Sequence, residues 1–246
     1  MNEFIFRKYD IRGIVETDFT DEVVVNLGKA FGTFVKRIGG KSVALSGDVR
    51  DTTPHLKKMF AQGLVSTGID VKDLGIIPTP TNYFSMYHLD IDGAVQITGS
   101  HNPPEFNGFK MSLSQKAFYG DQIQDLKLLI DNQDFEHGNG KVSNVPILQD
   151  YMDMLKSKIK LDKKLKIVMD CGNAAGCLSG PQIYKEMGIE VTELFCDVDA
   201  TFPNHHPDPT EDANLKDIIK VVKNGDFDFG VAFDGDADRV ILIDEK

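Results

Sequence analysis

The sequence is poor in cysteine and short of positive charge. Lys and Arg number 27 against 38 Asp and Glu, which gives a formal net charge of −11 over 246 residues. Nucleic-acid binding depends on many Lys and Arg contacts to phosphates, so this balance argues against a general nucleic-acid binder. The three cysteines, Cys171, Cys177 and Cys196, show neither the close pairing of zinc ligands nor a secreted disulfide framework. We interpret them as reduced thiols in or near the core.

Long apolar runs are also missing. No segment approaches the roughly 20 apolar residues that a membrane helix needs. Residues 1–10 lack the basic-then-apolar pattern of a secretory signal. Hydrophobic residues nevertheless make up 41% of the chain, which is enough for one large core or, better, two cores of ordinary domain size. The composition therefore predicts a globular protein of the cytoplasm that does not bind membranes.

Residues 1–150 alternate between strand-like and helical segments, as is typical of layered α/β proteins. Strands are predicted at Phe4–Phe6, Ser42–Ser46, Val71–Ile77 and Gly93–Thr98. Apolar residues at three- and four-residue spacing predict helices over residues 27–38, Pro54–Thr67 and Gln122–Ile130. Capping side chains for the second helix are offered by Asp51, Thr52 and Thr53. The polar, aperiodic residues 131–146 then place a domain boundary at about residue 150.

The α/β pattern restarts at residue 151. Helices are predicted at Tyr151–Ile159, Pro181–Met187 and residues 215–222. Strands are predicted at Lys166–Met169, Val191–Phe195, Phe229–Phe233 and Val240–Ile243. We therefore expect two successive α/β units, residues 1–150 and 151–246, rather than one continuous sheet. Because the sequence stops at Lys246 directly after a strand, we also expect it to be a piece of a longer protein.

A serine-containing segment, Thr98–Pro104, begins where the strand Gly93–Thr98 gives way to a loop. Such strand ends are where open α/β sheets bind ligands. Gly99 removes a side chain beside Ser100 and two prolines stiffen the exit, so we expect Ser100 on a rigid turn with open access, as a serine nucleophile requires. An ordinary hydrophilic turn is an equal alternative, because any turn uses these residue types.

Two basic residues follow Ser100. Adjacent residues on an extended chain point to opposite sides, and no G-x-S-x-G elbow is present, so we expect His101 to orient groups by hydrogen bonding rather than to serve as a triad base. Asn107 and Gly108 predict a tight turn that brings Lys110 back over the serine loop, where its charge would suit a phosphate. A solvated surface lysine is the common alternative.

Three carboxylates at alternate positions, Asp234, Asp236 and Asp238, follow the strand Phe229–Phe233. They repel one another unless a cation lies among them, and oxygen ligands select a hard ion such as Mg²⁺. An acidic surface turn is the bland alternative. A calcium loop of the EF-hand type would add Glu245, but it needs glycine where Arg239 stands and helices, not strands, on both sides.

Two further polar clusters carry weaker signals. One gathers charged and aromatic side chains near the N-terminus: Arg7, Lys8, Tyr9, Asp10 and Arg12. A salt-bridged solvent face explains that cluster equally well. The other places His205 and His206 in a proline-rich loop with Asp208, for which a polar surface loop is favoured over a metal site.

Three motifs, in this order and at these separations, resemble those of the α-D-phosphohexomutases: Phe6–Gly13, Thr98–Pro104 with Asn107–Lys110, and Asp234–Arg239. The serine motif resembles the phosphomannomutase/phosphoglucomutase branch more than the phosphoglucosamine branch. The resemblance covers essentially the whole chain. It implies two consecutive three-layer α/β/α domains with mixed sheets, the first with the phosphoserine loop and the second with the metal loop. The family's third and fourth domains would be absent.

The resemblance also implies an activity. Members of the family are isomerases that interconvert hexose 1-phosphate and hexose 6-phosphate, of mannose or glucose, through a phosphoserine and a 1,6-bisphosphate intermediate. Mg²⁺ would be the cofactor and glucose 1,6-bisphosphate the activator. The implied catalytic residues are Ser100, His101, Arg12 and Lys110. The implied metal ligands are Ser100, Asp234, Asp236 and Asp238. The implied substrate-binding residues are Tyr9, Arg12, Asn102, Lys110 and Arg239.

Because the sugar-specificity loop and the C-terminal phosphate-binding domain would be absent, we expect little or no turnover from this chain alone. A truncated, non-catalytic protein that binds sugar phosphates or has a regulatory role is the alternative. A calcium sensor is a third hypothesis. The preference between glucose and mannose and the oligomeric state are left open by the sequence.

Overall fold

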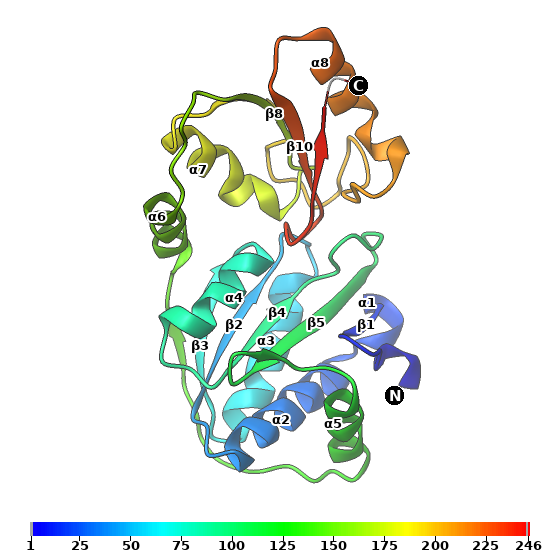
Figure 1. Cartoon of the computed structure of the whole chain (residues 1–246). Coiled ribbons are helices and arrows are strands. Elements are labelled where there is room, and N and C mark those ends of the chain that lie inside the picture. Colours follow the sequence, from blue (N-terminus) through cyan, green and yellow to red (C-terminus); the bar gives the residue numbers. More distant parts are fainter. Residues whose placement is uncertain (1, 245) are drawn as a thin grey trace.

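The computed structural model describes residues 2–244 and 246. They form two α/β units stacked end to end (Figure 1). The first sheet has the order β1-β5-β4-β2-β3-β7, with β6 paired to β5, and the second has the order β11-β10-β8-β9. The strands of the first sheet are β1 (Ile11–Ile14), β2 (Ser42–Gly47), β3 (Asp70–Ile76), β4 (Gly93–Ile97), β5 (Phe106–Leu113), β6 (Lys116–Ala117) and β7 (Val142–Asn144). Those of the second sheet are β8 (Lys166–Asp170), β9 (Glu190–Leu194), β10 (Phe229–Phe233) and β11 (Val240–Ile243).

Helices cover both faces of the first sheet. One face packs against α2 (Asp21–Arg37), α3 (Thr53–Ser66) and α5 (Asp121–Asp131), through a core that contains Phe31, Phe60, Phe109 and Phe118. The other face packs against α4 (Thr79–His88) and the start of α6 (Leu148–Lys158). The short helix α1 (Val15–Asp18) follows β1. The sheet is mixed, because β4, β2, β3 and β7 run parallel whereas β5 pairs antiparallel with β4 and β1.

The second unit repeats this arrangement on a smaller scale. Apolar residues of α7 (Gly180–Glu186) and α8 (Lys216–Asn224) pack on opposite faces of the four-stranded sheet. Short 3₁₀ helices lie at η2 (Ala175–Leu178) and η3 (Asp212–Leu215). Within the described part of the chain, the cysteines are free thiols in the core beside α7: Cys171, Cys177 and Cys196. Two α/β/α units with mixed sheets are therefore confirmed. The predicted boundary near residue 150 falls within α6.

Several local predictions are wrong. Phe4–Phe6 is not a strand: η1 (Glu3–Ile5) forms there, because the Asn2 side chain accepts a hydrogen bond from the Phe4 amide. The predicted caps of α3 accept no capping bond from the helix amides, and the Thr53 hydroxyl donates to Asp48 instead. The helix α4 was not predicted at all. Among the described residues, none of the helices is long and apolar enough to cross a bilayer.

The predicted turn at Asn107-Gly108 is also wrong, because both residues lie inside β5. The Asn107 amide is buried and donates to the hydroxyls of Thr52 and Thr53. Gly108 is required by close packing, since a Cβ there would lie 2.4 Å from the Ile11 carbonyl oxygen. The Asn-Gly pair, which is common in hairpin turns, therefore lies in a buried strand here.

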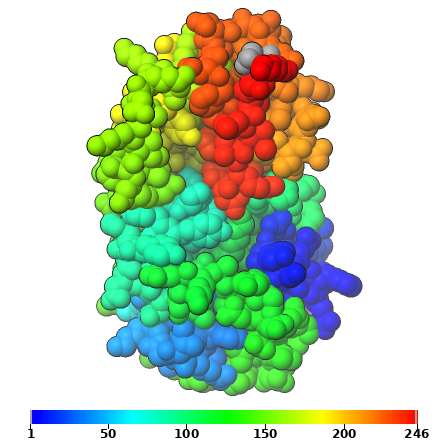
Figure 2. All heavy atoms as spheres, viewed as in Figure 1, coloured from blue at the N-terminus to red at the C-terminus, as the bar shows by residue number. Residues whose placement is uncertain are grey.

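The two units meet at the ends of their central strands. The loop after β4 and the loop between β10 and β11 face each other where the units touch (Figure 1). Figure 2 shows the C-terminal segment, in red, reaching the surface of the first unit. Ligands of open α/β sheets bind at the carboxyl ends of strands, so this junction is where a site is expected.

Candidate active site at the junction of the two units

Ser100 lies in the loop that follows β4. Its φ angle of 50° places it in the left-handed region, where a residue other than glycine needs support from its surroundings. The Ser100 amide donates to the Thr98 hydroxyl at 2.8 Å, and this hydroxyl donates to Asp48 Oδ2 at 2.8 Å. A buried network therefore holds the turn.

Two expectations about Ser100 are wrong. Its side chain does not have open access: the residue is 2% exposed, because the loop with Gly235 and Asp234 lies directly against it. Nor does His101 point away from it. The left-handed turn at Ser100 breaks the extended geometry, and His101 Nδ1 lies 3.2 Å from Ser100 Oγ.

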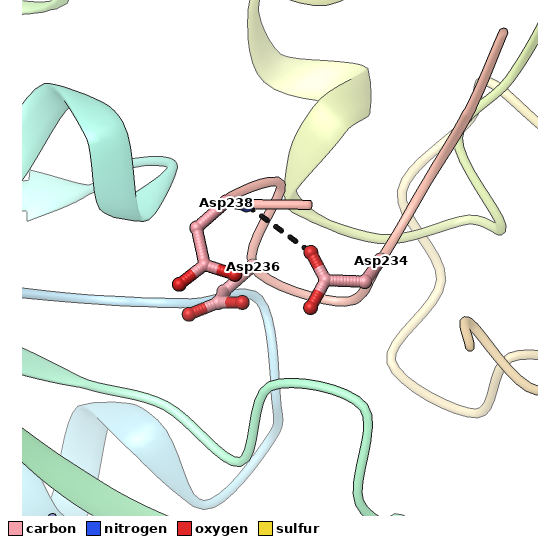
Figure 3. A group of neighbouring side chains, drawn as sticks. All are labelled: Asp234, Asp236 and Asp238. Atoms are coloured by element: carbon pink, nitrogen blue, oxygen red, sulfur yellow. Dashed lines mark hydrogen bonds between the residues drawn. The ribbon is translucent and has the colours of Figure 1, made fainter. Parts of the chain in front are cut away.

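The three aspartates form a compact cluster in the turn after β10. One oxygen or more from each of Asp234, Asp236 and Asp238 lies within 4.8 Å of the others. Figure 3 shows the three carboxylates gathered around the curl of this loop. The Asp238 amide donates to Asp234 Oδ1 at 3.1 Å, and Ala237 has a φ angle of 59°, which tightens the turn.

The serine and the aspartates are brought into direct contact. Ser100 Oγ donates to Asp234 Oδ2 at 3.0 Å, across 134 residues of sequence. The Thr79 hydroxyl at the start of α4 donates to Asp236 Oδ2 at 2.6 Å. The aspartate loop of the second unit is therefore tied to two loops of the first.

Lys110 projects from β5 into the cluster. Its Nζ lies 2.6 Å from both Asp236 Oδ2 and Asp238 Oδ2. Burial alone would lower the pKa of Lys110, but the two carboxylates outweigh burial and raise the pKa above its usual range. Lys110 thus reaches the site from a strand, not from a turn, and it is not a solvated surface lysine.

Arg239 and His101 lie on the other side of Asp234. The Arg239 guanidinium donates to Asp234 Oδ2, with Nη2 at 2.8 Å, and also to His101 Nδ1. Burial, followed by the Arg239 charge, lowers the pKa of His101. In a catalytic triad a carboxylate contacts Nδ1 of the histidine, whereas here the Arg239 guanidinium does so. This arrangement agrees with an orienting role for His101 rather than a role as triad base.

The charges of the cluster fit a divalent cation. Burial and the neighbouring carboxylates raise the pKa of Asp234 to about 7. Burial also acts to raise the pKa of Asp236, but the Lys110 ammonium outweighs it and holds that pKa below the ordinary value. Asp236 Oδ1 is buried and accepts no hydrogen bond from the described residues. Clustered oxygen ligands and an orphaned buried oxygen are what Mg²⁺ would satisfy.

The predicted substrate-binding residues border this cluster. Arg12 Nη1 donates to Asn102 Oδ1 at 3.1 Å, and Arg12 Nη2 pairs with Asp10 at 2.5 Å. Tyr9 is 69% exposed and lines a pocket of about 540 Å³ together with Lys110. The N-terminal cluster is therefore in part an ion pair beside the serine loop, not only a solvent face.

Three other residues of the site were not predicted from the sequence, Asp48, Arg50 and Thr79, and His206 was assigned to a polar surface loop. The first three follow β2 and β3, so the rule that ligands bind beyond strand ends would have found them. His206 donates from Nε2 to the His101 carbonyl oxygen, and His205 contacts Asp170 at 3.0 Å. These histidines are therefore packed against neighbours rather than free on a surface loop.

The flanks of the aspartate loop are β10 and β11, which argues against a calcium loop of the EF-hand type. Glu245, the twelfth position of such a loop, lies outside the described residues.

Comparison with known families decides the relationship. The family model described as phosphoglucomutase/phosphomannomutase, α/β/α domain I, matches residues 3–137, and the model for domain II matches residues 149–246. The chain belongs to the phosphoglucomutase/phosphomannomutase family. The motifs that carry the resemblance lie in the two matched regions.

Individual relatives extend this result. A phosphomannomutase/phosphoglucomutase of Pseudomonas aeruginosa is 43% identical over 239 residues, which is 97% of this chain and 52% of the relative. A phosphoglucomutase of Neisseria meningitidis is 42% identical over 241 residues, with the same coverage. The solved structure of a phosphoglucomutase/phosphomannomutase family protein from Burkholderia thailandensis matches with a TM-score of 0.96 at 40% identity, over 100% of this chain and 55% of that one. The chain thus spans about half the length of these relatives.

Proposed function

We propose that this chain carries the phosphoserine and metal parts of a phosphosugar mutase site. Ser100 would accept a phosphoryl group from hexose 1,6-bisphosphate and return it to hexose 1- or 6-phosphate. The contact between Ser100 Oγ and Asp234 Oδ2, at 3.0 Å inside the aspartate cluster, is the observation that supports this most. The names of the relatives, which pair phosphomannomutase with phosphoglucomutase, support mannose or glucose phosphates as substrates.

The proposed transfer exchanges one phosphorus–oxygen bond for another. A bond forms between Ser100 Oγ and phosphorus, the bond between phosphorus and the sugar oxygen breaks, and the proton of the serine hydroxyl ends on that sugar oxygen. In this structure the hydroxyl keeps its proton and donates a hydrogen bond to Asp234 Oδ2, so Asp234 could carry the proton from the serine to the departing sugar oxygen. Phosphoryl transfer needs positioning and charge neutralisation more than covalent help from the protein, so a buried, fixed serine suits it.

The surrounding residues would bind the metal ion, bind the phosphates and hold the serine loop. Asp234, Asp236, Asp238 and Ser100 Oγ would hold Mg²⁺, which when bound offsets the negative charge of the phosphoryl group. Lys110, Arg12 and Arg239 supply positive charge to the phosphates. His101 and Asn102 hold the serine loop through contacts with Arg239 and Arg12. Tyr9 borders the pocket in which a sugar would lie.

The test is transfer of label from [³²P]glucose 1,6-bisphosphate in the presence of Mg²⁺. We expect label on Ser100 of the wild-type chain and none on Ser100→Ala. Ser157→Ala is the matched control, because Ser157 is an exposed residue of α6 far from the site in sequence. Removal of Mg²⁺ with a chelator should abolish labelling. Equal labelling of Ser100→Ala and wild type would refute the proposal.

A second candidate follows from the length of the chain, which covers about half of each relative. It is a protein that binds sugar phosphates without turnover. Binding of the bisphosphate to wild type, measured by calorimetry, with no label on Ser100 would favour this candidate over the mutase.

A further inference from the structure

Arg50 lies beneath the serine loop and does not take part in the chemistry described above. Its side chain is 2% exposed. Nη1 donates to the carbonyl oxygens of Pro103 and Phe106, at 2.8 and 3.1 Å. Nη2 donates to those of Ser100 and Asn102, at 2.9 and 2.6 Å. One guanidinium therefore binds four backbone carbonyls of the segment that carries the serine.

The serine loop depends on such a donor. The segment from Ser100 to Glu105 contributes no strand or helix, so its carbonyls have few partners within the loop and take donors from outside it. A guanidinium offers five N–H groups fixed in one plane, whereas a lysine ammonium offers three from one point. Gly99 leaves the space that Arg50 fills, because a Cβ at Gly99 would lie 2.5 Å from the Arg50 Cζ. The missing side chain at Gly99 thus makes room for the Arg50 guanidinium.

Asp48 extends the same support to the start of the loop. Its Oδ2 lies 3.3 Å from Arg50 Nε. This oxygen also accepts hydrogen bonds from the Gly99 amide, at 3.1 Å, and from the Thr98 hydroxyl. The ion pair of Asp48 and Arg50 therefore holds both ends of the loop.

The second unit covers the guanidinium. The Phe202 ring centroid lies 5.4 Å from Arg50 Cζ, and Phe202 is 7% exposed. An aromatic face at this distance attracts a cation and excludes water from it.

We propose that Arg50 is a positioning residue, which fixes the serine loop so that Ser100 Oγ faces Asp234. The inference rests on the proposed function. Arg50 forms no hydrogen bond with Ser100 Oγ or with the aspartate cluster, so it acts on them through the backbone of the serine loop and through Asp48. Misplacement of a reacting group by about 1 Å costs on the order of 100-fold in rate.

The test compares Arg50→Lys with Arg37→Lys. Arg37 pairs with Asp134 on the surface of the first unit, so its variant controls for the substitution itself. We expect Arg50→Lys to lower the maximal rate of Ser100 labelling by about 100-fold, while the half-saturating bisphosphate concentration changes less than about three-fold. Loss of folded protein would instead lower the fraction of the chain that finally takes label, so the final extent of labelling should stay at the wild-type value. An unchanged maximal rate, or a loss confined to half-saturation, would overturn the proposal.

Hydrogen exchange separates this proposal from the proposed function. In Arg50→Lys the hydrogen-bonded amides of the serine loop should exchange at least ten-fold faster, while those of β2 and β4 keep their wild-type protection. These loop amides are Gly99, Ser100, Asn102 and Phe106. If wild type takes no label, the mutase proposal fails, and the exchange comparison still decides the role of Arg50: unchanged exchange in the loop would overturn it.

If Arg50→Lys does not fold, the variant Phe202→Leu tests the same proposal. It removes the aromatic face over the guanidinium and leaves Arg50 in place. Faster exchange in the serine loop and slower labelling are expected from it as well. Wild-type values for both would contradict the proposal.

Discussion

Charged side chains of the site are taken out of water and are therefore paired. Asp48, Asp234 and Asp236 are each at most 1% exposed. An uncompensated buried charge costs several kcal/mol, so each carboxylate needs a neighbouring cation. Arg50, Arg239 and Lys110 supply them. The sequence identified Asp234 and Asp236 by their spacing and missed Asp48. It could not show that Lys110 meets Asp236, because these partners lie 126 residues apart in the chain.

His205 gives the second unit a pH dependence. Burial acts to lower the pKa of His205, but the hydrogen bond to Asp170 and the charge of Asp217 help to raise it above the ordinary value. The folded state therefore holds the proton more tightly than the unfolded chain. This contribution to stability is complete below about pH 6.5, the unfolded pKa, and is lost as the pH rises through the folded pKa.

His205→Gln should remove that dependence. The glutamine amide can still donate to Asp170, so the variant loses the titration rather than the contact. Urea unfolding of the second unit, followed between pH 6 and pH 9, should show stability falling with pH in wild type and less so in the variant. His55→Gln is the control, because His55 pairs with Asp21 on the surface of the first unit. An NMR titration that gives His205 a pKa at or below 6.5 would contradict the prediction.

At the scale of helices and strands, apolar periodicity predicted the core elements and failed where packing imposes special residues. The strands β10 and β11 have the predicted bounds. The strand β5 was missed, because buried Asn107 and close-packed Gly108 look like a turn. The helix α4 was missed as well: it starts between two prolines, and its buried residues include polar ones such as Thr81 and Asn82. Local composition could not reveal partners that only the tertiary fold provides.

The crossing of α2 and α3 depends on two glycines. A Cβ at Gly63 would lie 2.2 Å from the Val25 carbonyl oxygen, and one at Gly28 would lie 2.3 Å from the Phe60 carbonyl oxygen. Alanine favours an isolated helix over glycine by about 1 kcal/mol. Here the obstacle is backbone, which cannot move aside as a side chain could, so overpacking should prevail and Gly63→Ala should destabilise the first unit by about 2 kcal/mol.

Urea unfolding followed by circular dichroism measures this effect. Gln62→Ala is the matched control, because Gln62 is the exposed neighbour on α3. If Gly63→Ala unfolds at the same urea concentration as Gln62→Ala, the helices have room to separate and the crossing is not set by the glycines.

For the whole molecule, the decisive event is the meeting of two loops that are remote in sequence. Strand ends predicted where each loop would lie, but not that Ser100 and Asp234 would touch across 134 residues. Nor could they predict that this meeting buries the serine. The contact arises because the aspartate loop packs on the first unit: the Thr79 amide donates to the Asp236 carbonyl oxygen at 2.9 Å. The proposed function thus depends on the junction and not on either unit alone.

Gly235 tests the junction. A Cβ at this position would lie 2.2 Å from the Ser100 carbonyl oxygen, and Gly235 is not among the residues with positive φ, so alanine suits the backbone. Gly235→Ala should therefore push the aspartate loop away from the serine loop while both units stay folded. We expect an unchanged circular dichroism spectrum and a fall of about 100-fold in the rate of Ser100 labelling. Gly63→Ala should give the opposite result, lower stability with labelling retained in the folded protein, because it strains one unit internally. Wild-type labelling by Gly235→Ala would mean that the two loops can adjust without separating Asp234 from Ser100.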